Sequence, residues 1–541
     1  MFDFTSYNDT QLEGKTFDVI VAGGGHNGLV SACYLAKGGL KVLVVEAHDT
    51  PGGMTSTNPM APEAPEHIIN EASIHASLFR LSPIDAELEL GTKFGLRQRQ
   101  IDPCHIQLMS AEDNESIALW NDPMKTAEEI RYFSPKDAKA WLQMSEVIDA
   151  AFKIAMPMML TSPVKPSFSA LMKAGGSAVK HWKHLKPIID LVTNSHAGAV
   201  EELFESDIVR AALLTGLPFM DFKVDTSAFA MVYMAALQST GITMFEGGTG
   251  AFPAALIRCL KHHGGEIKTG APIAEMIARD GAIKGVRLMS GDEIFASKGV
   301  ITAFSPKMVL NHMLPEGLLS DKMQTRAKRI PTNQRGVGDY KLNIALKGRI
   351  APTRHINWRK QRGWSEDMRL PTLQWQTYQQ ALQAYDACIQ GEVPDQIGGL
   401  SQITTAFDPS MAPEGCDTYW FWSGLIPSQP KADWNQVRDE ITAKTVRDAA
   451  IIYEGIEDLE IARRPLAPPD IEKRFFAIDG SVYHVEPYLT RFGAGRPMFG
   501  MADYKTPIPG LYLSGSGTHP SAGISGMPGR NAALAFVKNE K

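Results

Sequence analysis

The sequence predicts an α/β protein in which helices pack on a mostly parallel sheet, and three patterns lead to this fold class. An apolar run, Phe17 to Ala22, ends in a glycine-rich loop that a helical segment follows. A second apolar run, Lys41 to Val45, ends in the acidic residue Glu46. Near the other end, a short apolar run from Gly510 leads into another glycine-rich turn and a last helix. Strand, glycine loop, helix and strand in this order are typical of a Rossmann-type unit.

The loop after the first strand fits the G-x-G-x-x-G pattern of dinucleotide-binding sites. Its first glycine allows a tight turn, and its second lets the backbone approach a pyrophosphate. Its third lets the next helix, expected over Leu29 to Lys37, pack closely on the strand. The N-terminus of that helix offers free N–H groups to phosphate. The cofactor contacts expected in this loop are Gly23, Gly25, His26, Asn27 and Gly28.

Glu46 stands where the second strand of such a unit ends. An acidic residue at this place accepts hydrogen bonds from ribose hydroxyls and repels a 2′-phosphate. The glycine pattern alone is a weak signal. Here the glycines stand between a strand and a helix, and a second strand with an acidic end follows at the expected distance. This combination strongly predicts a dinucleotide site.

Composition limits the classes of function. The chain has 541 residues, so two or three domains are expected, and 44% apolar and 21% charged residues are typical of a globular protein. A net charge of -6 gives no basic surface for nucleic acid. The five cysteines are scattered without a CxxC pair, which argues against a zinc site or a disulfide framework. No apolar run is long enough for a transmembrane helix, and a cytoplasmic protein without a metal is expected.

The segment that follows Glu46 carries a resemblance to a known family. Glu46 to Gly53 resembles the E-A-x-x-x-x-G-G segment of the amine oxidase and phytoene desaturase group of FAD enzymes. In that group the paired glycines pass close to the pyrophosphate and the flavin, and many members have an arginine directly after them. The resemblance implies FAD contacts at Ala47, Gly52, Gly53 and Met54.

Two more segments resemble the same group. Gly247 to Leu256 is similar to its G-G-x-G-x-L-P-x-A-L helix start, and Gly510 to Ala532 is similar to its C-terminal flavin segment. The sequence of the last segment is most similar to that of the phytoene desaturase-like branch, which includes proteins named pyridine nucleotide-disulfide oxidoreductase domain-containing protein 2. The resemblance implies further FAD contacts at Ile273, Gly515, Ser516, Gly523 and Ile524.

These segments imply a domain arrangement. Residues 15–85, 240–310 and 475–541 are expected to form one glutathione-reductase-like FAD domain from discontinuous pieces. Residues 86–239 and 311–474 are expected to form an α+β substrate domain over the flavin. No cysteine lies in a segment expected to touch the isoalloxazine, so the FAD is predicted to be non-covalent.

Catalytic residues are less well defined. The family implies dehydrogenation, or desaturation, of a C–C bond in an apolar or cyclic small molecule, with hydride transfer to flavin N5. His484 and Glu71 are candidates for the flavin edge, although a structural role suits each at least as well. Oxidation of an amine or other C–H donor, flavin-dependent isomerisation or saturation, and a flavin-stabilised interaction protein stay open as alternatives.

The sequence leaves partners beyond the substrate undefined. The electron acceptor could be O₂, a quinone or another protein, and homo-oligomerisation and peripheral membrane contact both stay open. Two apolar stretches, Ala150 to Leu160 and Ser227 to Leu237, are expected to be core helices or walls of a substrate pocket, and a membrane-surface contact is the alternative for each. Lys165 to Lys186 is basic and interrupted by Pro and Gly, and it is expected on the surface.

Overall fold

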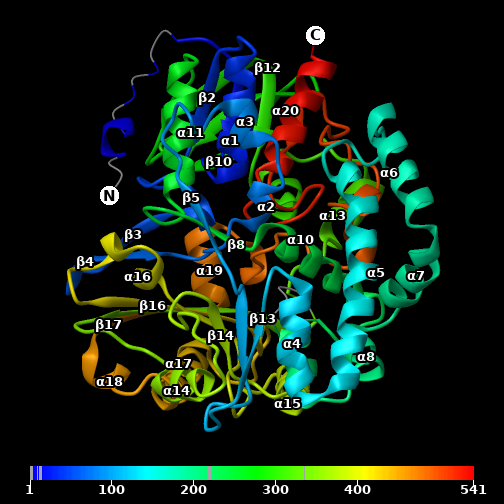
Figure 1. Ribbon diagram of the computed structural model, residues 1–541. Coiled ribbons are helices and arrows are strands. Elements are labelled where there is room, and N and C mark those ends of the chain that lie inside the picture. Colours follow the sequence, from blue (N-terminus) through cyan, green and yellow to red (C-terminus); the bar gives the residue numbers. More distant parts are fainter. Residues whose placement is uncertain are drawn as a thin grey trace.

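The computed structural model describes residues 4–8, 10, 12, 15–215, 221–333 and 335–540. Two seven-stranded sheets organise it, one in the upper half of Figure 1 and one in the lower half. Among the described residues, every helix is too short or too polar to span a bilayer.

The first sheet combines strands from both ends and the middle of the chain. Its order is β10-β11-β12-β1-β2-β9, and β18 pairs with β12. The pairs that join β1, β2, β9, β12 and β18 are parallel, whereas β10 and β11 add an antiparallel extension. Blue, green and red segments therefore meet at the top of Figure 1. The strands are β1 (Phe17–Ala22), β2 (Val42–Val45), β9 (Glu266–Lys268), β10 (Ile273–Arg279), β11 (Ala282–Leu288), β12 (Glu293–Thr302) and β18 (Leu511–Leu513).

Both faces of this sheet are covered, as a buried parallel sheet requires. Val19 and Val21 of β1 share a core with α1 (His26–Lys37), α11 (Ala251–His262) and α20 (Met527–Asn539). Ile20 and Ala22, which point the other way, share a second core with the β10–β11 extension and with η5 (Val309–Met313). The alternation along one strand thus sets the two layers that hold the glycine loop in place.

The second sheet has the order β17-β13-β16-β15-β14-β6-β7 and is largely antiparallel. One face packs on α4, α5, α8, α9, α10 and α15, and the other on α17 and its neighbours. The strands are β6 (His105–Leu108), β7 (Ser116–Leu119), β13 (Val337–Leu346), β14 (Thr372–Gln374), β15 (Leu400–Ile403), β16 (Asp417–Pro427) and β17 (Glu460–Leu466). Its helices are α4 (Pro123–Phe133), α5 (Pro135–Met159), α8 (His196–Leu203), α9 (Asp207–Thr215), α10 (Val232–Thr240), α14 (Thr353–Lys360), α15 (Tyr378–Ile389), α17 (Trp434–Ile452) and α18 (Ile456–Leu459).

The remaining elements connect these two halves or extend from them. Two helices, α6 (Phe168–Lys180) and α7 (Leu185–Thr193), stand beside α5 at the right edge of Figure 1. Two small sheets pair β3 with β4 and β5 with β8. The strands of these small sheets and the remaining α-helices are β3 (Thr57–Ala61), β4 (Ala64–Asn70), β5 (Gln98–Ile101), β8 (Ile242–Phe245), α2 (Ser77–Arg80), α3 (Ile84–Leu88), α12 (Pro306–Met308), α13 (Asp321–Lys328), α16 (Thr404–Phe407) and α19 (Pro468–Phe475).

The predicted division into two domains can be compared with the sheets. Every strand of the first sheet lies within residues 15–85, 240–310 or 475–541, and every strand of the second lies within 86–239 or 311–474. The boundaries themselves stay a prediction. The α/β class and the Rossmann-like arrangement of β1, α1 and β2 are present as predicted.

Candidate functional site

Among the glycines at the β1–α1 junction, the fold needs Gly23 and Gly28, whereas it does not need Gly25. Gly23 has φ +102°, which other residues rarely adopt. A Cβ on Gly28 would lie 2.1 Å from the carbonyl oxygen of Gly23. A Cβ on Gly25, in contrast, would meet no protein atom within 4 Å. Gly25 therefore opens onto space, at the N-terminus of a helix that has no side-chain cap.

A second glycine pair forms the other side of this space. Gly52 donates its N–H to the carbonyl of Gly24 at 2.9 Å and pairs with Gly25 in a parallel bridge. Gly52 and Gly53 have φ +124° and +56°, so both need the left-handed region. The next residue, Met54, packs in a small apolar cluster with α19. The two glycine segments thus form a cradle of backbone alone.

Glu46 lies at one end of the cradle, directly after β2. Its Oε2 accepts a hydrogen bond from the N–H of Gly24 at 2.7 Å, and its Oε1 accepts one from the N–H of His48 at 2.9 Å. Burial raises the pKa of this carboxyl. Ala271 donates its N–H to the carbonyl of Glu46 at 2.8 Å, which brings the start of β10 at Ile273 close to the same end.

The C-terminal turn closes the cradle from the opposite end of the sequence. Asn27 donates from Nδ2 to Ser516 Oγ at 3.2 Å, and the hydroxyls of Ser31 and Ser514 are hydrogen-bonded at 2.7 Å. A Cβ on Gly529 would lie 2.2 Å from the carbonyl oxygen of Asn27, so α20 lies directly against α1. Gly523 has φ +101°, and Ile524 beside it is buried in the core that α1 shares.

These residues fit a dinucleotide. Three buried polar atoms around the loop have no hydrogen-bond partner among the described residues: His26 Nε2, Asn27 Oδ1 and His484 Nδ1. With the uncapped helix N-terminus and the open space at Gly25, they form a place for phosphate and ribityl oxygens. The individual cofactor contacts predicted from the sequence stay predictions, but the structure brings their segments together.

His484 lies beside this cradle in a strained backbone conformation, with φ +58°. Burial, and then the nearby Arg496 and His26, lower the pKa of its imidazole to about 4. Arg496 is fully buried and donates to the carbonyls of Tyr483 at 3.0 Å and Ser516 at 2.7 Å. The arginine thereby ties the His484 segment to the C-terminal turn. The catalytic role proposed for His484 stays a prediction.

Glu71 is surrounded by cations. Its two carboxylate oxygens pair with Arg464 at 2.9 Å and Arg474 at 2.5 Å, and Ser56 donates its hydroxyl to it at 2.5 Å. Burial alone raises the pKa of Glu71, but Arg474 and Arg464 together outweigh burial, so this pKa lies below its usual value. Such a carboxylate is a weak base. Its surroundings suit a structural role better than proton transfer.

Sequence reasoning did not single out Lys341 on β13. It is 2% exposed and donates from Nζ to the side-chain oxygen of Asn343 at 2.8 Å. Its Nζ lies 4.6 Å from the ring centroid of Trp420, whose Nε1 donates to the carbonyl of Ala72 at 3.1 Å. Burial, followed by Arg464, lowers the pKa of Lys341 well below its usual value. A buried amine of this kind faces the segment that follows β4.

A cavity opens on the other side of the His484 segment. Its walls come from residues 221–229, β13, β16 and residues 483–489. Its lining includes three acidic and three aromatic side chains: Asp221, Asp339, Glu486, Phe229, Tyr483 and Tyr488.

Two carboxyls line this cavity, and one of them, Asp339, is buried. Trp422 donates from Nε1 to Asp339 Oδ1 at 3.1 Å, and burial, followed by Glu486, raises the pKa of Asp339 to about 8. Burial also raises the pKa of Glu486. No sequence motif marks Asp339. It lines the cavity because β13 pairs with β16 and because residues 483–489, far away in the sequence, form another wall.

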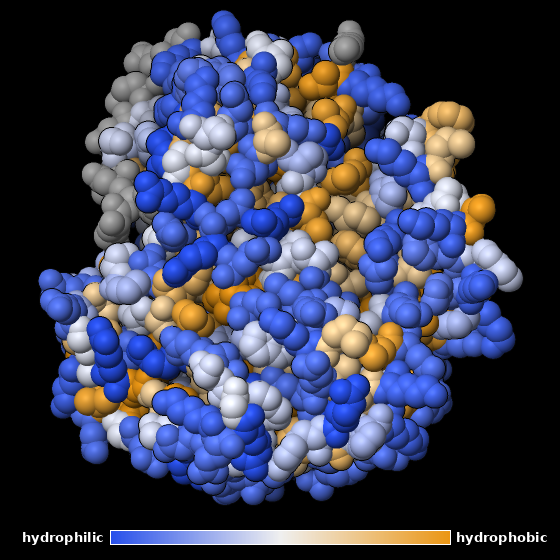
Figure 2. Space-filling view, in the orientation of Figure 1, coloured by the Kyte–Doolittle hydropathy of each residue, from blue (hydrophilic) through white to orange (hydrophobic). Residues whose placement is uncertain are grey.

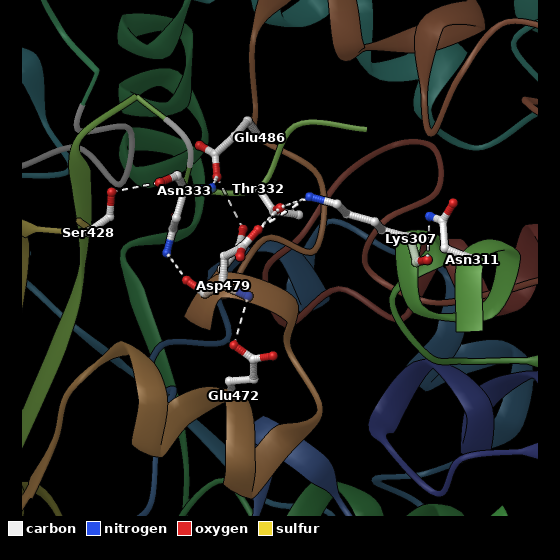
Figure 3. Close-up of polar contacts among 9 residues, drawn as sticks. Lys307, Asn311, Thr332, Asn333, Ser428, Glu472, Asp479 and Glu486 are labelled. Carbon is white, nitrogen blue, oxygen red and sulfur yellow. Dashed lines mark hydrogen bonds and ion pairs between the residues drawn. The ribbon is translucent and has the colours of Figure 1, made fainter. Parts of the chain in front are cut away.

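A polar network fixes the position of Glu486. Asn333 donates its N–H to Glu486 Oε1 at 2.7 Å and its Nδ2 to the carbonyl of Asp479 at 3.0 Å. Figure 3 shows Asn333 between these two acids, with Thr332 and Lys307 at the carboxylate of Asp479 and Glu472 at its backbone N–H. One wall of the cavity is therefore held by hydrogen bonds from three separate segments.

Comparison with known proteins agrees with this geometry. Residues 21–81 match the family model of the NAD(P)-binding Rossmann-like domain. The chain is 27% identical to the Mus musculus protein named pyridine nucleotide-disulfide oxidoreductase domain-containing protein 2, over 97% of this chain and 94% of the relative. It is 23% identical to the phytoene desaturase (lycopene-forming) of Pseudescherichia vulneris, over 96% and 99% of the two chains.

A solved structure shows the same fold. Cyclohexylamine oxidase from Brevibacterium oxydans superposes with a TM-score of 0.57 at 16% identity, over 97% of this chain and 99% of the other. The resemblance predicted from the sequence is confirmed. The chain is related to phytoene desaturases, is an oxidoreductase, and uses FAD.

Proposed function

We propose that this FAD-dependent oxidoreductase dehydrogenates a C–C bond of an apolar or cyclic small molecule bound in the cavity beside the His484 segment. When bound, FAD supplies the hydride acceptor, at flavin N5. The residues of the chain then have three tasks: to hold the substrate, to exclude water, and to take up the proton that leaves with the hydride.

The observation that carries the proposal is the position of the cavity. Arg496 ties Tyr483 to Ser516, so the segment that lines the cavity also lies against the C-terminal glycine turn. Rings of Phe229, Tyr483 and Tyr488 give the cavity an apolar wall. The relatives named phytoene desaturase act on an apolar molecule, as their name states, and that supports a substrate of this class.

Asp339 is the proton acceptor in this proposal. A base transfers protons best when its pKa lies near the working pH, and the pKa of Asp339 is about 8. By comparison, the pKa of His484 is about 4, and the pKa of Glu71 is lowered by its arginines. Since the carboxylate is the accepting form, the rate of flavin reduction should rise with pH and level off above about 8.

The first experiment is an anaerobic absorbance titration of the purified holoprotein. Phytoene in detergent micelles is added in one series, and NADH or NADPH in another. Bleaching of the oxidised-flavin band by phytoene alone would support dehydrogenation. Bleaching by a pyridine nucleotide alone would refute it in favour of saturation.

Asp339→Asn tests the proton acceptor. General-base catalysis contributes about 10²–10⁴ in rate, so this variant should slow flavin reduction by at least about 100-fold while it keeps its FAD. Asp225→Asn is the matched control, because Asp225 lines the same cavity but is exposed to solvent. Equal rates in wild type and Asp339→Asn would rule out this role.

Oxidation of an amine is a second candidate, and one observation favours it. Asp339 and Glu486 line the cavity, and carboxylates attract a cationic ligand. Asp221 and Tyr488 also line it, but Arg335 already pairs with Asp221 at 3.5 Å and lies 4.2 Å from the ring centroid of Tyr488. Neither Asp339 nor Glu486 takes part in a salt bridge among the described residues. Cyclohexylamine in air should then release peroxide. If it neither releases peroxide nor bleaches the flavin, this candidate is excluded for simple amines.

A further inference from the structure

An unusual surface lies over α6 and α7. In the segment 164–190, which we call the α6–α7 surface, large apolar side chains point into solvent. Phe168 is 78% exposed, Val179 74% and Trp182 66%. Figure 2 shows orange and pale orange side chains among blue ones at the right edge of the molecule, where Figure 1 places these helices. The other exposed apolar residues are Val164, Leu171, Met172, Leu185 and Ile189.

The spacing along α6 gathers these side chains on one face. Leu171, Met172 and Val179 stand three, four and eleven positions after Phe168, which places all four on one side of the helix. Ala170, on another side, is the one residue of α6 that is buried. The helix thus turns a small side chain towards α5 and its large apolar side chains away from the protein.

Charge separates this surface from the rest of the chain. It carries five lysines and one aspartate, whereas the whole chain has a net charge of -6. Lys165 pairs with Asp503 at 3.1 Å and Lys186 with Asp190 at 2.6 Å. Lys173, Lys180 and Lys183 take part in no salt bridge among the described residues.

We propose that the α6–α7 surface docks the protein on an anionic lipid bilayer. The apolar side chains would enter the interface between headgroups and acyl chains, and the lysines would meet the phosphate headgroups. A protein partner suits the surface less well, because lysine is depleted in the cores of protein–protein interfaces. Lysines interleaved with Trp and Phe are typical of helices that lie in a membrane surface.

The position of the surface relative to the cavity adds a consequence. α7 packs on η4 (Ser227–Met231), and Ser227 and Phe229 of η4 line the cavity. Docking would therefore place the lipid surface one layer of helix away from the cavity. The docking proposal does not depend on which reaction occurs there.

The test is co-sedimentation of the FAD-loaded protein with vesicles. One set is pure phosphatidylcholine, and the other contains about 30% phosphatidylglycerol. We expect binding to the anionic vesicles, loss of most binding in 0.5 M NaCl, and little binding to the neutral set. Each lysine near an anionic surface contributes about fivefold, so Lys173→Glu, Lys180→Glu and Lys183→Glu together should weaken binding on the order of 100-fold.

Two further variants make the test specific. Trp182→Ser with Phe168→Ser should also weaken vesicle binding, and because both side chains are exposed, FAD content and thermal stability should not change. Met289→Ser is the matched apolar control, since Met289 is 72% exposed on the β11–β12 turn. The matched charge control is Lys347→Glu, Lys360→Glu and Lys473→Glu, which are exposed on other elements.

Three outcomes would overturn the proposal. The first is equal binding to neutral and anionic vesicles. The second is unchanged binding in the variants of the α6–α7 surface. The third is a wild-type dimer in analytical ultracentrifugation that Trp182→Ser dissociates, because the surface would then be covered by a second copy of the chain.

Discussion

Replacing Gly25 by aspartate separates cofactor binding from folding. Gly25 has φ −65° and ψ 162°, which any residue can adopt, and a Cβ there meets no protein atom within 4 Å. It is also the N-cap of α1, where aspartate is favoured over glycine by a few tenths of a kcal/mol. The free energy of unfolding of the FAD-free protein should therefore change by less than about 1 kcal/mol.

The effect of Gly25→Asp on FAD should be much larger. The carboxylate would occupy the open space of the cradle, bind the free N–H groups of α1 and repel a pyrophosphate. Loss of two charge-assisted hydrogen bonds, at about 1.5–3 kcal/mol each, gives about 3–6 kcal/mol. This corresponds to a Kd for FAD that is about 10²–10⁴ times higher.

The assay uses the FAD-free protein. Quenching of FAD fluorescence gives Kd, and urea unfolding gives the stability of the protein without cofactor. Gly28→Ala is the contrasting variant, because its Cβ would lie 2.1 Å from the carbonyl oxygen of Gly23 and should destabilise the fold itself. If Gly25→Asp bound FAD with the wild-type Kd, the space at Gly25 would not be the pyrophosphate site.

Two further predictions concern buried charges. Glu71→Gln should lower the free energy of unfolding at pH 7 by about 3–5 kcal/mol, because Arg464 and Arg474 lose their partner. The pKa of Glu71 is lowered in the folded state, so its contribution to the free energy of unfolding is present above the usual glutamate pKa and is lost as pH falls through the folded pKa. Urea unfolding should therefore give wild type and Glu71→Gln the same stability at low pH. Lys341→Met should raise the free energy of unfolding at pH 7 by roughly 1–4 kcal/mol, as when other buried charges are replaced by apolar groups. Because the pKa of Lys341 is lowered on folding, this gain should shrink as pH approaches the usual lysine pKa, and a gain independent of pH would contradict the reasoning.

The sequence predicted the dinucleotide unit well because its signals are local. The strand predicted over Phe17 to Ala22 matches β1, and Glu46 follows β2 as expected. The helix begins at His26, one turn before the predicted Leu29, because Gly25 already caps it. Each of these features depends on a few neighbouring residues, so a single sequence is enough to find them.

The polar cavity could not be predicted in the same way. On β13, Asp339, Lys341 and Asn343 alternate with Tyr340 and Leu342, and a polar alternate face is normally exposed to solvent. Both faces of this strand are buried, and the end of β4 lies against the polar one, where Asn343 donates to the carbonyl of Asn70. Only the packing of segments distant in sequence gives these polar side chains their burial.

Glu71 gives the same lesson for a single side chain. Its arginines lie about 400 positions further along the chain, on β17 and α19. Without them, a buried carboxylate after the pyrophosphate segment resembles a catalytic group. Whether Glu71 is a structural or a catalytic group depends on which side chains it pairs with, and only the tertiary structure shows them.

The contact between Asn27 and Ser516 has a consequence for how the protein is made. During synthesis the glycine loop emerges long before its closing partner, because Asn27 and Ser516 are 489 positions apart. The cofactor site can therefore close only after Ser516 has been made, when every strand of the two large sheets has already emerged. A ligand that binds only the folded state stabilises it in proportion to its free concentration. The supply of FAD in the cell would then decide how long newly made copies survive proteolysis.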